Sequence, residues 1–198
     1  MNRALYVAGW GYVALCGFVV ATHGQPRLGD PGLRVPTRTH PVATVAGGAG
    51  EWFAQVKPFC NAVEVEVRQQ QMPAPNGVEG AGYSAACYAL AGKIERARTV
   101  IDALSAGDRA QAASIVFNIG HPVADAGDDQ SAGPIMRLVV SYQPDNYMAL
   151  YHAGMSEYIL GQMDFARTHL RKFLDLYHDP DGYRNNAVEV LKRLDAKP

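Results

Sequence analysis

The stretch that decides the fold is Tyr147–Pro180, which reads YMALYHAGMSEYILGQMDFARTHLRKFLDLYHDP. Gly161 lies between two segments of this stretch that are rich in apolar residues. A glycine permits the sharp turn that joins two neighbouring helices, because it lacks the Cβ that restricts other residues. The stretch therefore predicts a helical hairpin.

The same pattern recurs toward the N-terminus. Three glycines are separated by 35 and 34 residues, and an alanine follows each by five positions: Gly92, Gly127 and Gly161, with Ala97, Ala132 and Ala166. A small residue stands seven positions before each glycine and a large apolar residue nine positions after it: Ala85, Gly120 and Gly154, with Ile101, Met136 and Leu170. We expect the small residues to let helices approach closely and the large ones to fill the space between adjacent hairpins.

This spacing resembles the tetratricopeptide repeat family, whose unit is a helix-turn-helix of about 34 residues. Residues 147–180 carry the resemblance most clearly, and residues 78–112 and 113–146 fit it more loosely, with Pro144 at the expected inter-repeat proline. The matching signature positions are Leu150, Gly154, Tyr158, Gly161, Ala166, Leu170, Phe173 and Leu174. The resemblance implies an all-α fold: a short α-solenoid of about three hairpins over residues 77–198, with N-terminal helices and a C-terminal capping helix at Tyr183–Leu194.

The middle unit departs from the family at Pro122. A proline inside a helix removes a hydrogen bond and clashes with the preceding turn, at a cost of about 3 kcal/mol. We therefore expect a helix over residues 108–120, an irregular loop through Asp128, and a second helix capped near Ser131. Pro134 would then sit harmlessly in the first turn of that helix.

Residues 1–21 are typical of a targeting segment, because Arg3 precedes an unbroken run of apolar residues and glycine from Ala4 to Ala21. The run fits a cleaved signal peptide, and it also just reaches the length of a membrane anchor. Residues 22–50 follow as a linker rich in proline and glycine. No later stretch is apolar enough to cross a membrane, so we expect an exported body on the periplasmic or extracellular face, either free or anchored in the inner membrane.

Residues 51–76 are expected to form an N-terminal helical cap. Asn61 with Glu64 resembles a helix capping box, whereas residues 63–67 alternate like a strand. Helix is favoured, because no partner strand of comparable quality exists elsewhere in the chain. Export lets thiols pair, so we expect a disulfide between Cys60 and Cys87, with two buried free cysteines as the alternative.

Composition and motifs argue against nucleic-acid binding and catalysis. The chain carries 18 Lys+Arg against 19 Asp+Glu, for a net charge of -1, so it lacks a basic field for a phosphate backbone. It has no Gly-x-Ser-x-Gly elbow, no Walker loop and no dinucleotide-binding glycine motif after a strand. We expect neither an enzyme nor a bound cofactor.

One acidic segment leaves an alternative open. His121, Asp125, Asp128 and Asp129 gather within nine residues in the expected loop. An imidazole with carboxylates suits a divalent ion, but the spacing fits no known metal-binding loop, and acidic residues before a helix ordinarily cap it. Capping is favoured over a metal site. The histidines of the last unit form no zinc-binding pair and are interpreted as surface or packing residues: His152, His169 and His178.

In the family, the concave face formed by the first helix of each unit binds extended peptides. The resemblance assigns eight residues of this chain to that face: Glu79, Ala86, Phe117, His121, Met148, Tyr151, Met155 and Tyr158. Tyrosine and methionine suit a binding surface, although several of these side chains can instead pack against the preceding unit.

The resulting hypothesis is an exported adaptor or scaffold of the cell envelope whose groove binds an extended segment of a partner protein. The first alternative is a metal-binding protein or metal-dependent enzyme centred on the loop from His121 to Asp129. The second is an architectural protein that assembles into a homo-oligomer.

Overall fold

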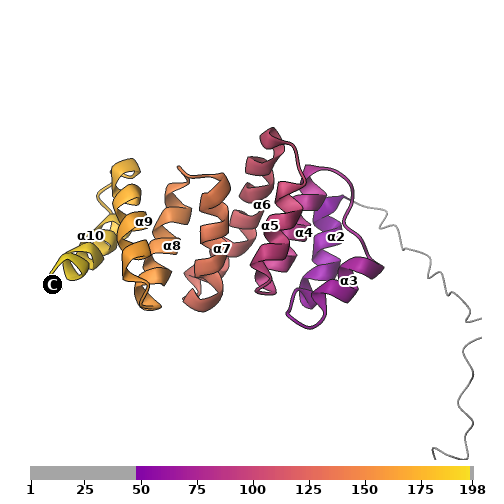
Figure 1. The fold of residues 1–198 in the computed structure, drawn as a ribbon, viewed down its shortest axis with the longest axis horizontal. Coiled ribbons are helices and arrows are strands. Elements are labelled where there is room, and N and C mark those ends of the chain that lie inside the picture. The colour runs from indigo at the N-terminus through magenta and orange to yellow at the C-terminus, as the bar shows by residue number, and fades with distance from the viewer. Residues whose placement is uncertain (1–47, 197–198) are drawn as a thin grey trace, which may run out of the picture. The chain divides into compact units, whose positions relative to one another are not determined.

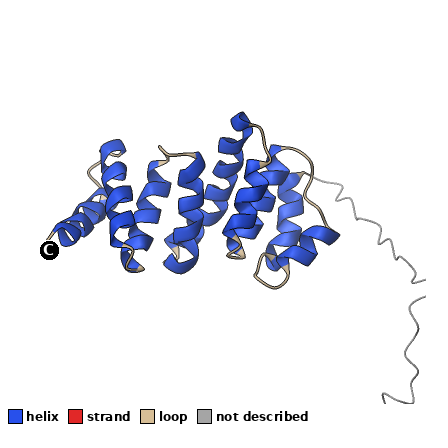
Figure 2. Ribbon diagram, viewed as in Figure 1, coloured by secondary structure: helices blue, strands red, loops and turns tan. Residues whose placement is uncertain are grey.

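A computed structural model describes residues 48–196, and this part of the chain is entirely helical (Figures 1 and 2). The predicted all-α class is confirmed for this part, and the strand-like residues 63–67 contribute to a helix and the turn before it. The helices are α2 (Ala49–Val56), a 3-10 turn (Lys57–Phe59), α3 (Val65–Gln71), α4 (Val78–Leu90), α5 (Ile94–Asp102), α6 (Ala106–Asp125), α7 (Asp129–Tyr142), α8 (Tyr147–Ile159), α9 (Met163–Leu176) and α10 (Gly182–Asp195).

Helices α4 to α9 form three pairs, and each pair is joined at one of the recurrent glycines. Gly92, Gly127 and Gly161 have positive φ angles of 72°, 77° and 78°. Side chains with a Cβ rarely adopt this backbone, so the glycines serve the turns as predicted. Consecutive pairs also touch one another, with α4 against α6 and α7 against α8. In Figure 1 the helices follow one another in chain order from α4 to α10, with α2 and α3 at the N-terminal end.

In the second and third pairs, large residues pack against the small residue of the same hairpin. A Cβ added to Gly154 would lie 2.7 Å from Leu170 Cγ. One added to Gly120 would lie 2.6 Å from Ile135 Cγ2 and 3.4 Å from Met136 Cε. These contacts lie within one hairpin, and the expected filling between adjacent hairpins stays a prediction.

The middle pair corrects the prediction made from Pro122. Helix α6 continues past Pro122 to Asp125, so the expected irregular loop is only the short turn that precedes α7. Pro122 and Asn118 are both exposed, so the Asn118 carbonyl that loses its helical partner can bind water, which reduces the cost of the proline. Asp128 is the N-cap of α7 and accepts a hydrogen bond from Ser131 N at 3.2 Å, which confirms the capping interpretation for this residue. Pro134 lies in the interior of α7, beyond its first turn.

Three kinds of contact tie the N-terminal helices α2 and α3 to each other and to the first pair, α4 and α5. Trp52 is fully buried, and its indole N–H donates to the Met72 carbonyl at 2.9 Å. Cys60 and Cys87 form the predicted disulfide, with their Cα atoms 4.9 Å apart. Glu66 lies 3.4 Å from Lys93 Nζ and 3.3 Å from Arg96 Nε. The Asn61 side chain accepts from the backbone N–H of Glu64 at 3.0 Å, but this bond lies in the turn before α3, whose N-cap is Glu64.

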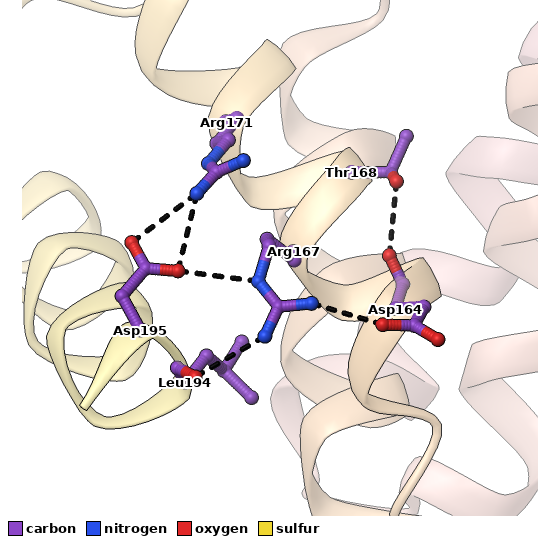
Figure 3. A network of polar contacts seen from close by, with 6 residues as sticks. All are labelled: Asp164, Arg167, Thr168, Arg171, Leu194 and Asp195. Carbon is purple, nitrogen blue, oxygen red and sulfur yellow. Dashed lines mark hydrogen bonds and ion pairs between the residues drawn. The ribbon is translucent and has the colours of Figure 1, made fainter. Parts of the chain in front are cut away.

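The predicted closing helix is confirmed as α10. Asp181 caps it by accepting from Arg184 N at 3.1 Å, and its apolar face is buried through Ala187, Val190, Leu191 and Leu194. Figure 3 shows that the Asp195 carboxylate forms ion pairs with two arginines of α9. Its Oδ1 atom lies 3.2 Å from Arg167 Nε and 3.1 Å from an Arg171 guanidinium nitrogen. Arg167 also donates to the Leu194 carbonyl at 3.1 Å, so polar contacts surround the end of α10.

The predicted targeting segment, residues 1–21, lies outside the described residues, as does the linker up to residue 47. Helix α2 begins at Ala49, two residues before the predicted start of the N-terminal helical cap. Among the described helices, none combines the length and the apolarity that crossing a membrane requires.

Candidate functional site

The first helices of the second and third pairs, α6 and α8, bring a group of aromatic and imidazole side chains together. Phe117 and His121 are one helical turn apart on α6, and their rings stack with centroids 5.0 Å apart. The His121 ring meets the edge of the His152 ring on α8 at 4.7 Å. His152 in turn lies 5.2 Å from the ring of Tyr151. A continuous row of rings therefore passes from α6 to α8.

Asp125 completes this group from the last turn of α6. Its Oδ1 atom lies 3.6 Å from His121 Nε2 and 3.7 Å from His152 Nε2, and one ligand atom from each of the three residues falls within 4.8 Å of the others. The exposed fraction of the side chains rises from 8% for His152 through 29% for His121 to 54% for Asp125. The cluster is thus closed on its histidine side and open on its carboxylate side.

The two histidine nitrogens of this cluster are unsatisfied. His121 Nε2 and His152 Nε2 are buried and have no hydrogen-bond partner among the described residues. The Asp125 oxygen is too far away, because hydrogen bonds of this kind need about 2.7–3.2 Å. A buried polar atom without a partner costs about 1–3 kcal/mol, so these two atoms are an unusual feature of the fold.

Burial keeps His152 in its neutral form. Desolvation lowers the pKa of His152 from its ordinary 6.5 to about 4, and the neighbouring His121 acts in the same direction. Asp125 and Asp129 oppose this shift but do not overcome it. At neutral pH the imidazole is therefore uncharged, which is the form that offers a nitrogen lone pair.

The remaining acidic residues of the segment have structural roles. Asp128 caps α7, and Asp129 accepts a hydrogen bond from the Ser156 hydroxyl at 2.8 Å, which ties the start of α7 to α8. The predicted four-residue grouping therefore separates into Asp128 and Asp129, which fix the start of α7, and His121 and Asp125, which lie near His152. Sequence spacing alone does not reveal this division.

An open depression lies beside the ring cluster, between α6 and the turn that leads into α8. Its volume is about 630 Å³, and it is lined by Ala110, Ser114, Phe117, Tyr142, Gln143, Pro144, Asp145, Asn146, Tyr147 and Met148. Tyr147 is 43% exposed and stacks on Tyr177 at 5.2 Å. Apolar rings and an adaptable thioether thus share one surface with amide and carboxylate groups.

The residues that the family resemblance assigned to a groove fall into three sets. Phe117 and Met148 line the depression together, and His121 stacks on Phe117. Tyr151 is only 6% exposed, because it packs against Phe173 and Tyr183. Met155 and Tyr158 pack against the same C-terminal core as Tyr151. The third set lies on α4, where Glu79 is exposed and Ala86 is buried.

Sequence reasoning missed the position of His152 and the role of Glu157. Gly120 and Gly154 occupy equivalent positions of two repeat units. His121 follows Gly120 by one residue and His152 precedes Gly154 by two, so the repeat does place the two histidines at similar heights along their helices. Glu157 is 1% exposed and contacts His169 Nδ1 at 2.7 Å, with Arg137 Nε at 3.9 Å. His169 is accordingly a packing residue, and His178 is exposed.

Comparison with known proteins gives no match: no family model, no curated protein and no solved structure aligns with this chain. The class that the described residues define is an all-helical protein with paired helices and a clustered imidazole and carboxylate site.

Proposed function

We propose that this chain is a tetratricopeptide-like helical repeat protein that works outside the cytoplasm as an adaptor or scaffold. It holds an extended segment of a partner protein in the depression between α6 and the start of α8. The observation that carries this proposal is that Phe117 and Met148 line one open depression, since the family resemblance assigns both positions to the binding face.

The repeat register supports the solenoid part of the proposal. Three helix pairs turn at glycines of nearly equal φ, and Ala97, Ala132 and Ala166 are all fully buried. Helices α4 and α6 contact one another, and so do α6 and α8. A stack of hairpins places its first helices side by side in this way, and such stacks present an extended surface for peptides.

The chemistry of the depression suits an extended peptide. Gln143 donates to the Ala110 carbonyl at 2.7 Å, and Asn146 caps α8 by accepting from Ala149 N at 3.0 Å, so these amides are held in place by the scaffold. Phe117 and Met148 offer apolar contact beside them. Ordered polar groups next to an apolar surface provide both orientation and affinity.

The disulfide supports export. Disulfides persist in oxidising compartments and are rare in the cytosol, where thiols are kept reduced. The Cys60–Cys87 bond, together with the targeting segment predicted at residues 1–21, supports a location beyond the inner membrane.

Photo-crosslinking tests the binding surface. A photoreactive phenylalanine analogue is placed at Phe117 in the full chain, and separately at Phe165, which is 57% exposed on α9 and serves as the matched control. We expect Phe117 to capture one partner and Phe165 to capture none. The captured segment is then made as a peptide, and its affinity is measured for the native chain and for Phe117→Ala with Met148→Ala, with Phe165→Ala as the control.

The expected result is an affinity loss of at least tenfold in the double variant alone, with unchanged helicity by circular dichroism. Two results would overturn the proposal: equal crosslinking from both positions, or peptide affinity that the double variant retains. Crosslinking from Phe117 to a second copy of this chain would instead support the architectural alternative.

A further inference from the structure

The cluster of His121, Asp125 and His152 has the composition of a metal site rather than of a packing contact. His121 and Asp125 are four residues apart on α6, so they project from one face of the helix, and His152 reaches the same point from α8. Imidazole nitrogens and a carboxylate oxygen are the ligands that zinc and related divalent transition metals accept.

The distances are close to those of a tetrahedral site. Bonds of about 2.0–2.1 Å at tetrahedral angles would set neighbouring ligand atoms roughly 3.3 Å apart. Asp125 Oδ1 lies 3.6 Å and 3.7 Å from the two Nε2 atoms. One ligand atom from each of the three residues lies within 4.8 Å of the other two, so side-chain rotations would have to bring these atoms closer together to bind one ion.

The unsatisfied nitrogens point to a ligand independently of the residue types. His121 Nε2 and His152 Nε2 are both buried without a hydrogen-bond partner in the described part of the chain, and the His152 side chain is 92% buried. A metal ion would satisfy both atoms at once.

The helices that carry the donors are fixed by close packing. Gly120 stands beside His121 and meets Ile135, while Gly154 lies two residues from His152 and meets Leu170. A hydrogen bond of 2.8 Å from the Ser156 hydroxyl to Asp129 joins α8 to the start of α7, the helix that follows α6. Donors on packed helices are preorganised, so little ordering is needed when the ion binds.

We propose that His121, Asp125 and His152 bind one divalent transition-metal ion, with zinc as the favoured ion, through Nε2, Oδ1 and Nε2. The ion joins α6 to α8 and thereby links the second helix pair to the third. The exposed carboxylate leaves a fourth position open to water or to an external donor. This site does not depend on peptide binding in the neighbouring depression.

The test uses the full chain, freed of metal by a chelator and titrated with Zn²⁺ in an isothermal calorimeter. We expect one equivalent to bind and the melting temperature to rise with added Zn²⁺. Co²⁺ serves as a spectroscopic probe, because four-coordinate Co²⁺ gives a strong visible absorption that an ion bound loosely at the surface does not.

The variants separate this site from the other histidines of the chain. Asp125→Asn changes an exposed side chain, and Asp175→Asn, at an exposed position of α9, is the matched control. Loss of even an outer-shell partner of a metal ligand weakens binding by about 10–100-fold, so Asp125→Asn is expected to weaken Zn²⁺ at least that much. His121→Gln is expected to abolish the Co²⁺ absorption, and Asp175→Asn is expected to change neither signal.

Three results would overturn the proposal. The first is a metal-free chain that takes up no Zn²⁺ and gains no thermal stability from it. The second is that Asp125→Asn binds Zn²⁺ as tightly as the control Asp175→Asn does. The third is a Co²⁺ absorption that survives in His121→Gln. Circular dichroism of each variant, taken before titration, confirms that the comparison is made between folded proteins.

Discussion

The two ends of the helical array are closed by similar ion pairs but by different cores. At the N-terminal end Glu66 lies between Lys93 and Arg96, and at the C-terminal end Asp195 lies between Arg167 and Arg171 (Figure 3). Beyond this shared pattern, the N-terminal end has a disulfide and a fully buried tryptophan. The C-terminal end has one amphipathic helix with aliphatic contacts.

This difference teaches which interactions hold a terminal helix in place. Ion pairs between exposed side chains contribute about 0–1 kcal/mol each, so they are too weak to hold the terminal helices in place by themselves. Helices α2 and α3 are short, at 8 and 7 residues, whereas α10 has 14 residues and a four-residue apolar face. The shorter helices offer fewer residues for packing, so the N-terminal end is held by one large buried ring, Trp52, and by the covalent bond beside it.

The largest effect is expected from the core of the N-terminal end. Trp52→Ala removes a fully buried ring and its 2.9 Å hydrogen bond to Met72, and we expect the free energy of unfolding to fall by about 3–5 kcal/mol. Leu194→Ala at the other end should cost about 2–3 kcal/mol, near the low end of its range, because Leu194 lies one residue before α10 ends and its surroundings can relax. Urea denaturation measures both values. A larger loss for Leu194→Ala would reverse the comparison.

Reduction of the disulfide should act on one end alone. Cys60 and Cys87 are 27 residues apart, and removing such a bond costs about 3 kcal/mol, or roughly 6–12 °C in melting temperature for a chain of this size. Hydrogen exchange under reducing conditions should show faster exchange in α2 and α3, with α10 unchanged. The double variant Cys60→Ser with Cys87→Ser should behave like the reduced protein, and equal loss of protection in α10 would contradict the assignment of the bond to one end.

The smallest effects are expected from the ion pairs, and they depend on pH. Partial burial raises the pKa of Glu66, but Lys93 and Arg96 outweigh it and hold the pKa below its ordinary 4.5. The pKa of Asp195 is likewise below its ordinary 3.8, because Arg167 and Arg171 outweigh the effect of burial. A carboxyl with a lowered folded pKa stabilises the fold above its unfolded value and loses that contribution as the pH falls through the folded value.

We therefore expect the Glu66 contribution to decline below about pH 4.5 and that of Asp195 below about pH 3.8. Melting temperatures of Glu66→Gln and Asp195→Asn, measured across this range, should each lack the corresponding part of the acid dependence. Both differences from the native chain should shrink at about 1 M salt, where the screening length falls to roughly 3 Å. Variants whose acid profiles match the native chain would show that these pairs contribute nothing.

Much of the fold could be predicted because helix pairing leaves a periodic trace. Gly92, Gly127 and Gly161 mark turns that only glycine adopts easily, and the alternation of small and large residues follows from close contact between helices. The prediction failed at Pro122, because local propensity predicted a break while a solvent-exposed position allowed the helix to continue. A helix can continue through a proline where the carbonyl that loses its partner can still bind water.

The candidate site could be predicted only in part. Phe117 and His121 do lie side by side on α6, since residues four apart share one side of a helix. Their assignment to a binding face stays a prediction. Tyr151 was assigned to the same face, but α10 covers it: Tyr183 packs against its ring, and Asn186 donates to its hydroxyl at 3.3 Å. The pattern of one helix does not reveal which later helix will cover it.

The sequence by itself determined the helical class, the turns, the disulfide partners and the closing helix, because each depends on local chemistry or on a fixed spacing along the chain. Only the tertiary structure decided that His152 meets His121 and Asp125, since that contact joins two helices whose rotation is set by how Gly120 and Gly154 pack. A site built from separate helices requires the distance between them, and that distance is a property of the packed core rather than of any one segment.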